Sequence, residues 1–67
     1  MNVEIGMKYI KRGDKQKHVR TVTDCHKTYN NAGELVKTRY VSTHELMGQP
    51  IYDYDVVQPT IAMGLVS

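Results

Sequence analysis

Four side chains of the sequence are of types that bind transition metals: Cys25, His26, His18 and His44. Zinc takes four nitrogen or sulfur ligands that converge on one point, at about 2.0–2.3 Å from the ion. Cys25 and His26 are neighbours in a predicted strand, so their side chains leave opposite faces of the sheet. His18 and His44 would be diagonal neighbours on paired strands, but two ligands do not complete a site. The sequence therefore predicts no metal site and no cofactor.

Catalysis by the protein's own side chains has two candidates. Cys25 would need a base within hydrogen-bonding reach, and the adjacent His26 points to the other face of the predicted strand. Asp53 and Asp55 share one face of another predicted strand, as an acid–base pair would. Any alternating strand produces that spacing, and a chain of 67 residues has little material for a deep, water-excluding pocket. We therefore predict that the protein is not an enzyme, with Asp53 and Asp55 as a solvated acidic edge.

The remaining functional signal is a cluster of basic residues within a segment of ten. Its members are Lys11, Arg12, Lys15, Lys17 and Arg20. Small β-barrels bind single-stranded nucleic acids by combining such a basic surface with aromatic side chains on which bases stack. Tyr9 precedes the cluster, and Tyr40 is expected on a neighbouring strand. We take the cluster and these two tyrosines as the predicted binding residues, for a protein partner or a nucleic acid.

The distribution of charge also points to the N-terminal half of the chain. Residues 1–40 contain all nine Lys and Arg against four acids, whereas residues 41–67 contain three acids and no Lys or Arg. The net charge of +2 conceals this local asymmetry. Two interpretations stay open: the two halves attract each other within the fold, or the N-terminal half presents a basic patch to a partner.

Strand patterns dominate the segments that must position these residues. Residues 3–9 alternate apolar and polar side chains, which predicts a half-buried strand. Residues 11–18 are polar and typical of a charged loop. Residues 19–29 and 35–46 are rich in Val, Thr and Tyr. The Asn-Asn-Ala-Gly sequence at residues 30–33 favours a hairpin turn between them.

The C-terminal part completes the predicted fold. Residues 42–47 favour strand and helix equally, and residues 47–50 are expected to form a turn. Residues 51–57 alternate as a strand, and residues 60–63 are expected to form a short last strand. Five short strands predict an all-β fold, a small antiparallel five-stranded barrel or curled sheet with a long central hairpin. The main alternative is an open sheet that a partner subunit completes.

Cross-strand charges suggest a register for the central hairpin. Closing the turn at residues 30–33 sets Asp24 opposite Arg39, which is a favourable pair. A shift by one residue would set Lys27 opposite Lys37, which repel each other. We predict the first register, although a β-bulge at the turn would make the second acceptable.

Length and cysteine content limit the remaining possibilities. Residues 1–67 form a single small β domain, and a chain of this size buries only about 60% of its unfolded surface. Cys25 is the only cysteine, so no internal disulfide reinforces the core, and we predict a homodimer. A single thiol and the lack of a signal-peptide pattern predict a cytoplasmic protein. Since no apolar stretch approaches 18 residues, we expect no membrane-spanning segment.

Several short runs carry a resemblance: RTVTD at residues 20–24, GELV at 33–36, RYV at 39–41 and DYDV at 53–56. They resemble small uncharacterised proteins encoded by bacteriophages and prophages. Gly6, Tyr9 and the basic loop around Gly13 are similar to the opening of SH3-like small β-barrels. The resemblance implies an accessory protein that contacts a host molecule or associates with nucleic acid.

Together these features predict a non-enzymatic interaction module, a phage- or prophage-type accessory protein that binds a host or viral protein in the cytoplasm of the host cell. The basic loop would steer the partner, and exposed tyrosines would supply contact area. The alternative is a small β-barrel that binds single-stranded nucleic acid through the basic loop at residues 11–20 and tyrosine platforms.

Overall fold

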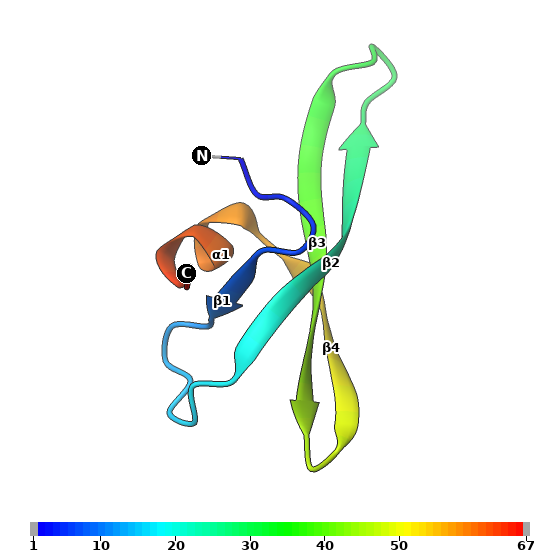
Figure 1. Ribbon diagram of the computed structural model, residues 1–67. Helices are drawn as coiled ribbons and strands as arrows, with labels where there is room; N and C mark the ends of the chain where they lie inside the picture. Colours follow the sequence, from blue (N-terminus) through cyan, green and yellow to red (C-terminus); the bar gives the residue numbers. More distant parts are fainter. Residues whose placement is uncertain (1, 67) are drawn as a thin grey trace.

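The computed structural model describes residues 2–66 and shows a mostly β fold (Figure 1). One antiparallel sheet has the strand order β1-β2-β3-β4. Its strands are β1 (Lys8–Ile10), β2 (Val19–Tyr29), β3 (Leu35–Leu46) and β4 (Gln49–Val56), and one helix follows, α1 (Gln58–Met63). No helix within residues 2–66 has the length and apolar character needed to cross a membrane.

The sheet is open and has four strands, so the chain does not form the expected five-stranded barrel. Residues 60–63, predicted as the last strand, belong to α1 instead. Pro59 lies in the first turn of this helix, where its fixed φ suits the helix and its missing N–H is not needed. The first strand is also shorter than predicted, because Gly6 lies in a turn with φ +98° and the regular ladder with β2 begins at Lys8.

The long central hairpin of β2 and β3 is confirmed, and so is its turn. The Asn30 side chain organises the turn, since its Oδ1 accepts hydrogen bonds from the backbone N–H groups of Ala32 and Glu34, both at 2.9 Å. Gly33 adopts φ +80°, a conformation that a residue without Cβ reaches at little cost. Residues 42–47, for which strand and helix were both open, continue β3 and enter its turn with β4.

The register of the hairpin differs from the predicted one. The backbone N–H of Asn30 donates to the carbonyl oxygen of Glu34 at 3.0 Å, so the turn closes one residue later than predicted. An irregularity of the ladder between residues 28 and 29 then shifts the pairing again, and Lys27 faces Thr38. The repulsion between Lys27 and Lys37 that argued against this register is therefore absent.

The predicted charge pair does not form. The shift between residues 28 and 29 also places Asp24 opposite Val41 and not opposite Arg39, and a second shift follows between Val22 and Asp24. Arg39 instead forms a salt bridge with Asp55 of β4, at 2.8 Å between Nη1 and Oδ1. Two β-bulges in one strand pair explain why a single offset could not describe the hairpin.

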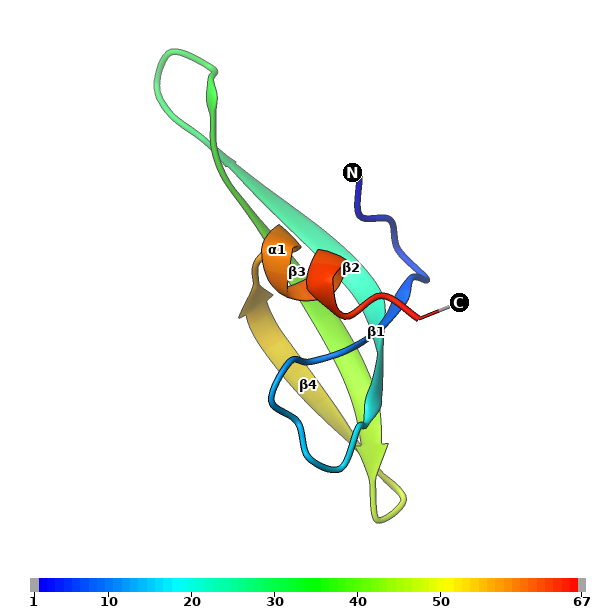
Figure 2. The same ribbon diagram turned by 90° about the vertical axis from the view of Figure 1, so that its left-hand side faces the viewer.

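The core lies on one face of the sheet, where β1, α1 and the N-terminal segment gather (Figures 1 and 2). Its buried cluster consists of Tyr9, Val22, Tyr40 and Ile61. Beyond α1, Gly64 lies so close to β1 that a Cβ atom there would overlap the carbonyl oxygen of Ile10. The contact is held by a hydrogen bond from the N–H of Ile10 to the carbonyl oxygen of Gly64, at 2.8 Å.

The far half of the central hairpin extends beyond this core. Every residue from 26 to 37 is exposed, and we call this segment the hairpin arm. It contributes to the elongated shape of the molecule, whose principal extents are 44, 23 and 19 Å (Figure 1). The sequence predicted the hairpin but not that half of it would lack a covering layer.

Candidate binding surface

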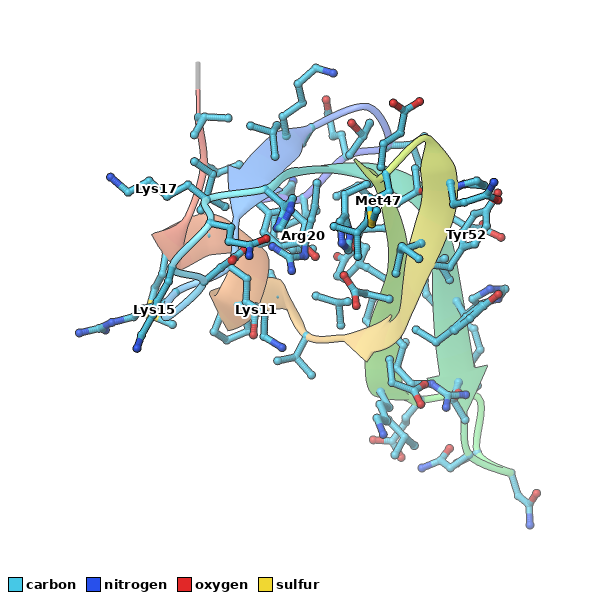
Figure 3. The ribbon with its side chains drawn as sticks, turned by 90° about the horizontal axis from the view of Figure 1, so that it is seen from below. Lys11, Lys15, Lys17, Arg20, Met47 and Tyr52 are labelled. Carbon is cyan, nitrogen blue, oxygen red and sulfur yellow. The ribbon has the colours of Figure 1, made fainter. Side chains whose placement is uncertain are left out.

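Four cationic side chains are exposed on the loop between β1 and β2. They are Lys11, Arg12, Lys15 and Lys17, and we call residues 11–17 the basic loop. Figure 3 shows Lys15 and Lys17 extending away from the sheet. None of the four forms a salt bridge with another residue of the described segment 2–66. The structure therefore places these four predicted residues together and leaves their charges accessible.

The carboxylate of Asp14 fixes the backbone of the basic loop. Its Oδ1 accepts a hydrogen bond from the N–H of Gln16, and its Oδ2 accepts one from the N–H of His18, both at 3.0 Å. Arg20 donates to the same Oδ2 from Nη1 at 2.9 Å. The hydrogen bond from Arg20 and the backbone N–H groups hold the pKa of Asp14 well below its usual value, although partial burial acts in the opposite direction. Asp14 is therefore an internal anchor that stays ionised.

Arg20, the fifth residue of the predicted cluster, is buried. Only 8% of its surface is exposed, and its guanidinium lies between two carboxylates. Its Nε donates to Oδ2 of Asp53 at 2.9 Å, while its Nη1 donates to Asp14. Burial disfavours the charged form of Arg20, but both carboxylates outweigh this effect and raise its pKa above the usual range. Arg20 therefore ties the basic loop to β4 and offers no charge to a partner.

Two histidines complete this polar cluster. The rings of His18 and His44 lie side by side, with their centroids 5.2 Å apart, as the diagonal arrangement suggested. His18 Nδ1 lies 3.3 Å from Asp14 Oδ2. His44 Nδ1 is buried 3.7 Å from Asp53 Oδ2, without a hydrogen-bond partner in the described part of the chain. Within residues 2–66, no three side chains of Cys, His, Asp or Glu converge closely enough to hold a metal ion.

The two tyrosines expected at the binding surface belong to the core. Tyr9 is 1% exposed and Tyr40 is 8% exposed, so neither ring is accessible for stacking with a base. Burial raises the pKa of Tyr9, against the opposing effect of its hydrogen bond with Ser42. Strand alternation correctly groups such residues on one face, but it does not reveal which face α1 and the N-terminal segment will cover.

Sequence reasoning did not select the tyrosines that are exposed. Tyr52 and Tyr54 of β4 have exposed fractions of 51% and 69%, and their rings stack with centroids 6.3 Å apart. The sequence did place Tyr52 and Tyr54 two residues apart in a predicted strand, which puts both rings on one face, and this spacing could have identified them. Figure 3 places Tyr52 on the opposite side of the molecule from Lys15 and Lys17. Tyr52 is therefore remote from the basic loop, whereas Tyr54 lines a hollow of about 180 Å³ together with Lys11.

The predicted acidic edge is divided between the two faces of the sheet. Asp53 turns toward the buried guanidinium of Arg20, whereas Asp55 pairs with Arg39. A shift in the β3–β4 ladder explains this, since Asp55 adopts the left-handed conformation with φ +60°. Both carboxylates are thus paired with arginines, and they do not form a row of free acids.

A groove lies between the basic loop and the C-terminal end of α1. Its volume is about 550 Å³, and its lining residues are Ile10, Lys11, Arg12, Gly13, Asp14, Lys17 and Met63. The Met63 side chain is 62% exposed, and its Sδ lies 3.9 Å from Nη1 of Arg12. The candidate binding surface is therefore the basic loop together with this groove.

Comparison of the chain with protein-family models, with curated proteins and with solved structures finds no match.

Proposed function

We propose that the protein is a non-enzymatic binding module whose basic loop docks onto an acidic surface of a partner protein. The observation that carries this proposal is the set of four exposed cations on one short loop whose only carboxylate, Asp14, is bound internally by Arg20. The charge presented to solvent is thus of one sign. Such a field accelerates encounter with an acidic partner and disfavours basic ones.

The fixed shape of the loop supports the same function. The side chain of Asp14 accepts hydrogen bonds from three donors. Two backbone turns flank this residue: its N–H donates to the carbonyl oxygen of Lys11 at 3.0 Å, and its carbonyl oxygen accepts from the N–H of Lys17 at 3.2 Å. A loop that is ordered before binding loses less conformational entropy when a partner docks. The network of Asp14 and Arg20 therefore holds the cations in place before a partner binds.

A protein partner fits this surface better than a single-stranded nucleic acid does. Proteins that bind single strands combine cations with aromatic side chains on which bases stack. Tyr9 and Tyr40 are buried here, and the exposed Tyr52 lies away from the loop. Tyr54 shares a hollow with Lys11 but with none of the other three cations. The resemblance of several runs to phage and prophage proteins makes a bacterial host protein or a viral protein in the host cytoplasm the first candidate, by analogy.

An affinity pulldown from bacterial lysate, with and without nuclease, tests the proposal. One variant reverses charges on the basic loop: K11E, R12E and K15E. A matched control reverses the exposed lysines outside the loop: K8E, K27E and K37E. Both variants change the net charge equally, so only a contact at the loop distinguishes them.

We expect a specific protein that survives nuclease treatment, is retained by the control variant and is lost with the loop variant. Equal loss with both variants would show that net charge alone is responsible and would overturn the assignment to the loop. Recovery of nucleic acid alone, or of proteins that disappear with nuclease, would instead identify a nucleic-acid-binding module. In that case affinity for single strands should fall steeply with salt, through release of counterions.

A further inference from the structure

We propose that the groove between the basic loop and α1 binds a short acidic peptide segment that carries bulky apolar side chains at its centre. This inference rests on the proposed function and specifies the chemistry of the partner at the same site. The groove brings an apolar floor and a cationic rim together at one place. Charge complementarity defines the flanks of the bound segment, and the floor defines its centre.

The floor of the groove is apolar and adaptable. Met63 exposes 62% of its surface, beside the half-buried Ile10 of β1. Methionine is unbranched and polarisable, so it can fit side chains of different shape. Lys11 and Lys17 also line the groove, and the aliphatic stem of a lysine can cover apolar surface while its ammonium group stays in water. The groove has a volume of about 550 Å³ and is shallow and open to solvent, so an apolar side chain would lie across its surface.

The rim of the groove selects for acidic neighbours of those apolar side chains. Lys11, Arg12 and Lys17 surround the opening, and Arg12 is held near the floor by its contact with Met63. A guanidinium in this position can bind a carboxylate through two parallel hydrogen bonds. Asp14 also lines the groove, but its oxygens are engaged by Arg20 and by backbone N–H groups, and the three cations of the groove outnumber it.

The chemistry of the floor favours a peptide over a nucleic acid. A nucleic acid also supplies negative charge, but its bases need a flat aromatic surface for stacking. Among residues 2–66, no aromatic residue lines the groove, whereas the flexible side chain of Met63 suits a Leu, Met or Phe side chain. An acidic segment with an apolar centre therefore satisfies both parts of the groove.

NMR titration of the full chain tests this inference, because it detects weak binding and locates it. The first probe is a peptide with a central Leu-Leu pair flanked on both sides by Asp and Glu. The second probe has Ser-Ser in the centre, and an oligothymidylate is the third. The variant Met63→Gln removes the apolar floor, and Met47→Gln is the matched control. Met47 is 94% exposed on the turn between β3 and β4, away from Lys15 and Lys17 (Figure 3).

We expect the Leu-Leu peptide to bind about tenfold more tightly than the Ser-Ser peptide, as partial burial of leucine side chains would give. The methyl signals of Ile10 and Met63 should shift, and that of Met47 should not. Met63→Gln should remove the tenfold preference and leave the affinity for the Ser-Ser peptide unchanged. Met47→Gln should leave both affinities unchanged.

Equal affinity for the two peptides would overturn the inference while leaving acidic docking at the basic loop intact. Tighter binding of oligothymidylate than of either peptide would overturn both proposals in favour of a nucleic-acid ligand. Absence of binding by both peptides would also refute the groove assignment. The pulldown with reversed loop charges then decides separately whether the proposed function stands.

Discussion

A buried hydrogen bond joins Tyr9 of β1 to Ser42 of β3, and its removal can be predicted in detail. The two hydroxyl oxygens lie 2.6 Å apart, and the residues are 1% and 0% exposed. Tyr9→Phe leaves the Ser42 hydroxyl without its partner, and Ser42→Ala does the same to the Tyr9 hydroxyl. A buried polar group that loses its partner costs about 1–3 kcal/mol, so we expect each single change to lower the free energy of unfolding by about 2 kcal/mol.

The double variant should behave differently from the sum of its parts. Replacing both groups removes the bond without leaving a buried hydroxyl unpaired, so the double variant should lose about 2 kcal/mol of unfolding free energy in total. The coupling energy between Tyr9 and Ser42 would then be about 2 kcal/mol. A chain of 67 residues has a stability of about 3–10 kcal/mol, so all the variants should remain folded enough to measure.

Urea unfolding followed by far-ultraviolet circular dichroism measures all three variants. Tyr54→Phe is the control, because this tyrosine is 69% exposed and should lose no stability when its hydroxyl is removed. Costs that simply add in the double variant would refute the reasoning. So would a cost for Tyr9→Phe no larger than that of the control.

Three further changes probe the loop, the helix packing and the second hairpin. Because Asp14 has a folded pKa below its unfolded value of 3.8, its contribution is present above pH 3.8 and lost as the pH falls below it. Urea midpoints of Asp14→Asn should therefore depend less on pH than those of the unchanged protein between about pH 5 and pH 2. Gly64→Ala should cost about 1–3 kcal/mol in urea unfolding, because its Cβ would displace Ile10; an unchanged midpoint would contradict this close approach. Met47→Asn should raise the free energy of unfolding by about 0.5–1 kcal/mol and raise the melting temperature, because Met47 has φ +52° and asparagine tolerates that conformation better. A lower melting temperature would count against this.

Local sequence patterns predicted the parts of the fold that local residues determine. The turn at residues 30–33 was predictable because Asn30 and Gly33 supply its hydrogen bonds and its positive φ. The segment at residues 60–63 was not, because four residues are too few to separate a period of two from a period of 3.6. The hairpin register failed for another reason, since β-bulges leave little trace in a sequence.

The binding residues that depend on local sequence were likewise predictable, and those that depend on distant contacts were not. Four exposed cations were predictable because a polar loop stays in solvent. The burial of Arg20 depends on Asp53, which lies 33 residues away in the sequence and meets Arg20 only in the folded sheet. Tyr9 and Tyr40 were predicted at the surface because residues 60–63 were predicted as a strand, whereas they belong to α1, whose Ile61 joins both rings in the core. The homodimer, which was inferred from the thin core, stays a prediction that sedimentation at several concentrations would test.

The hairpin arm at residues 26–37 makes the stability of the molecule uneven. A two-stranded ribbon is at best marginally stable by itself, so the arm should open and close many times for each unfolding of the whole domain. The chain has no tryptophan, and its fluorescence comes from tyrosines on both parts, with Tyr29 in the arm and Tyr9 and Tyr40 in the core. Emission thus mixes two events, whereas hydrogen exchange separates them residue by residue. Amides of the arm should exchange at the same rates in Tyr9→Phe as in the unchanged protein, because that substitution weakens only the transition in which the core is lost.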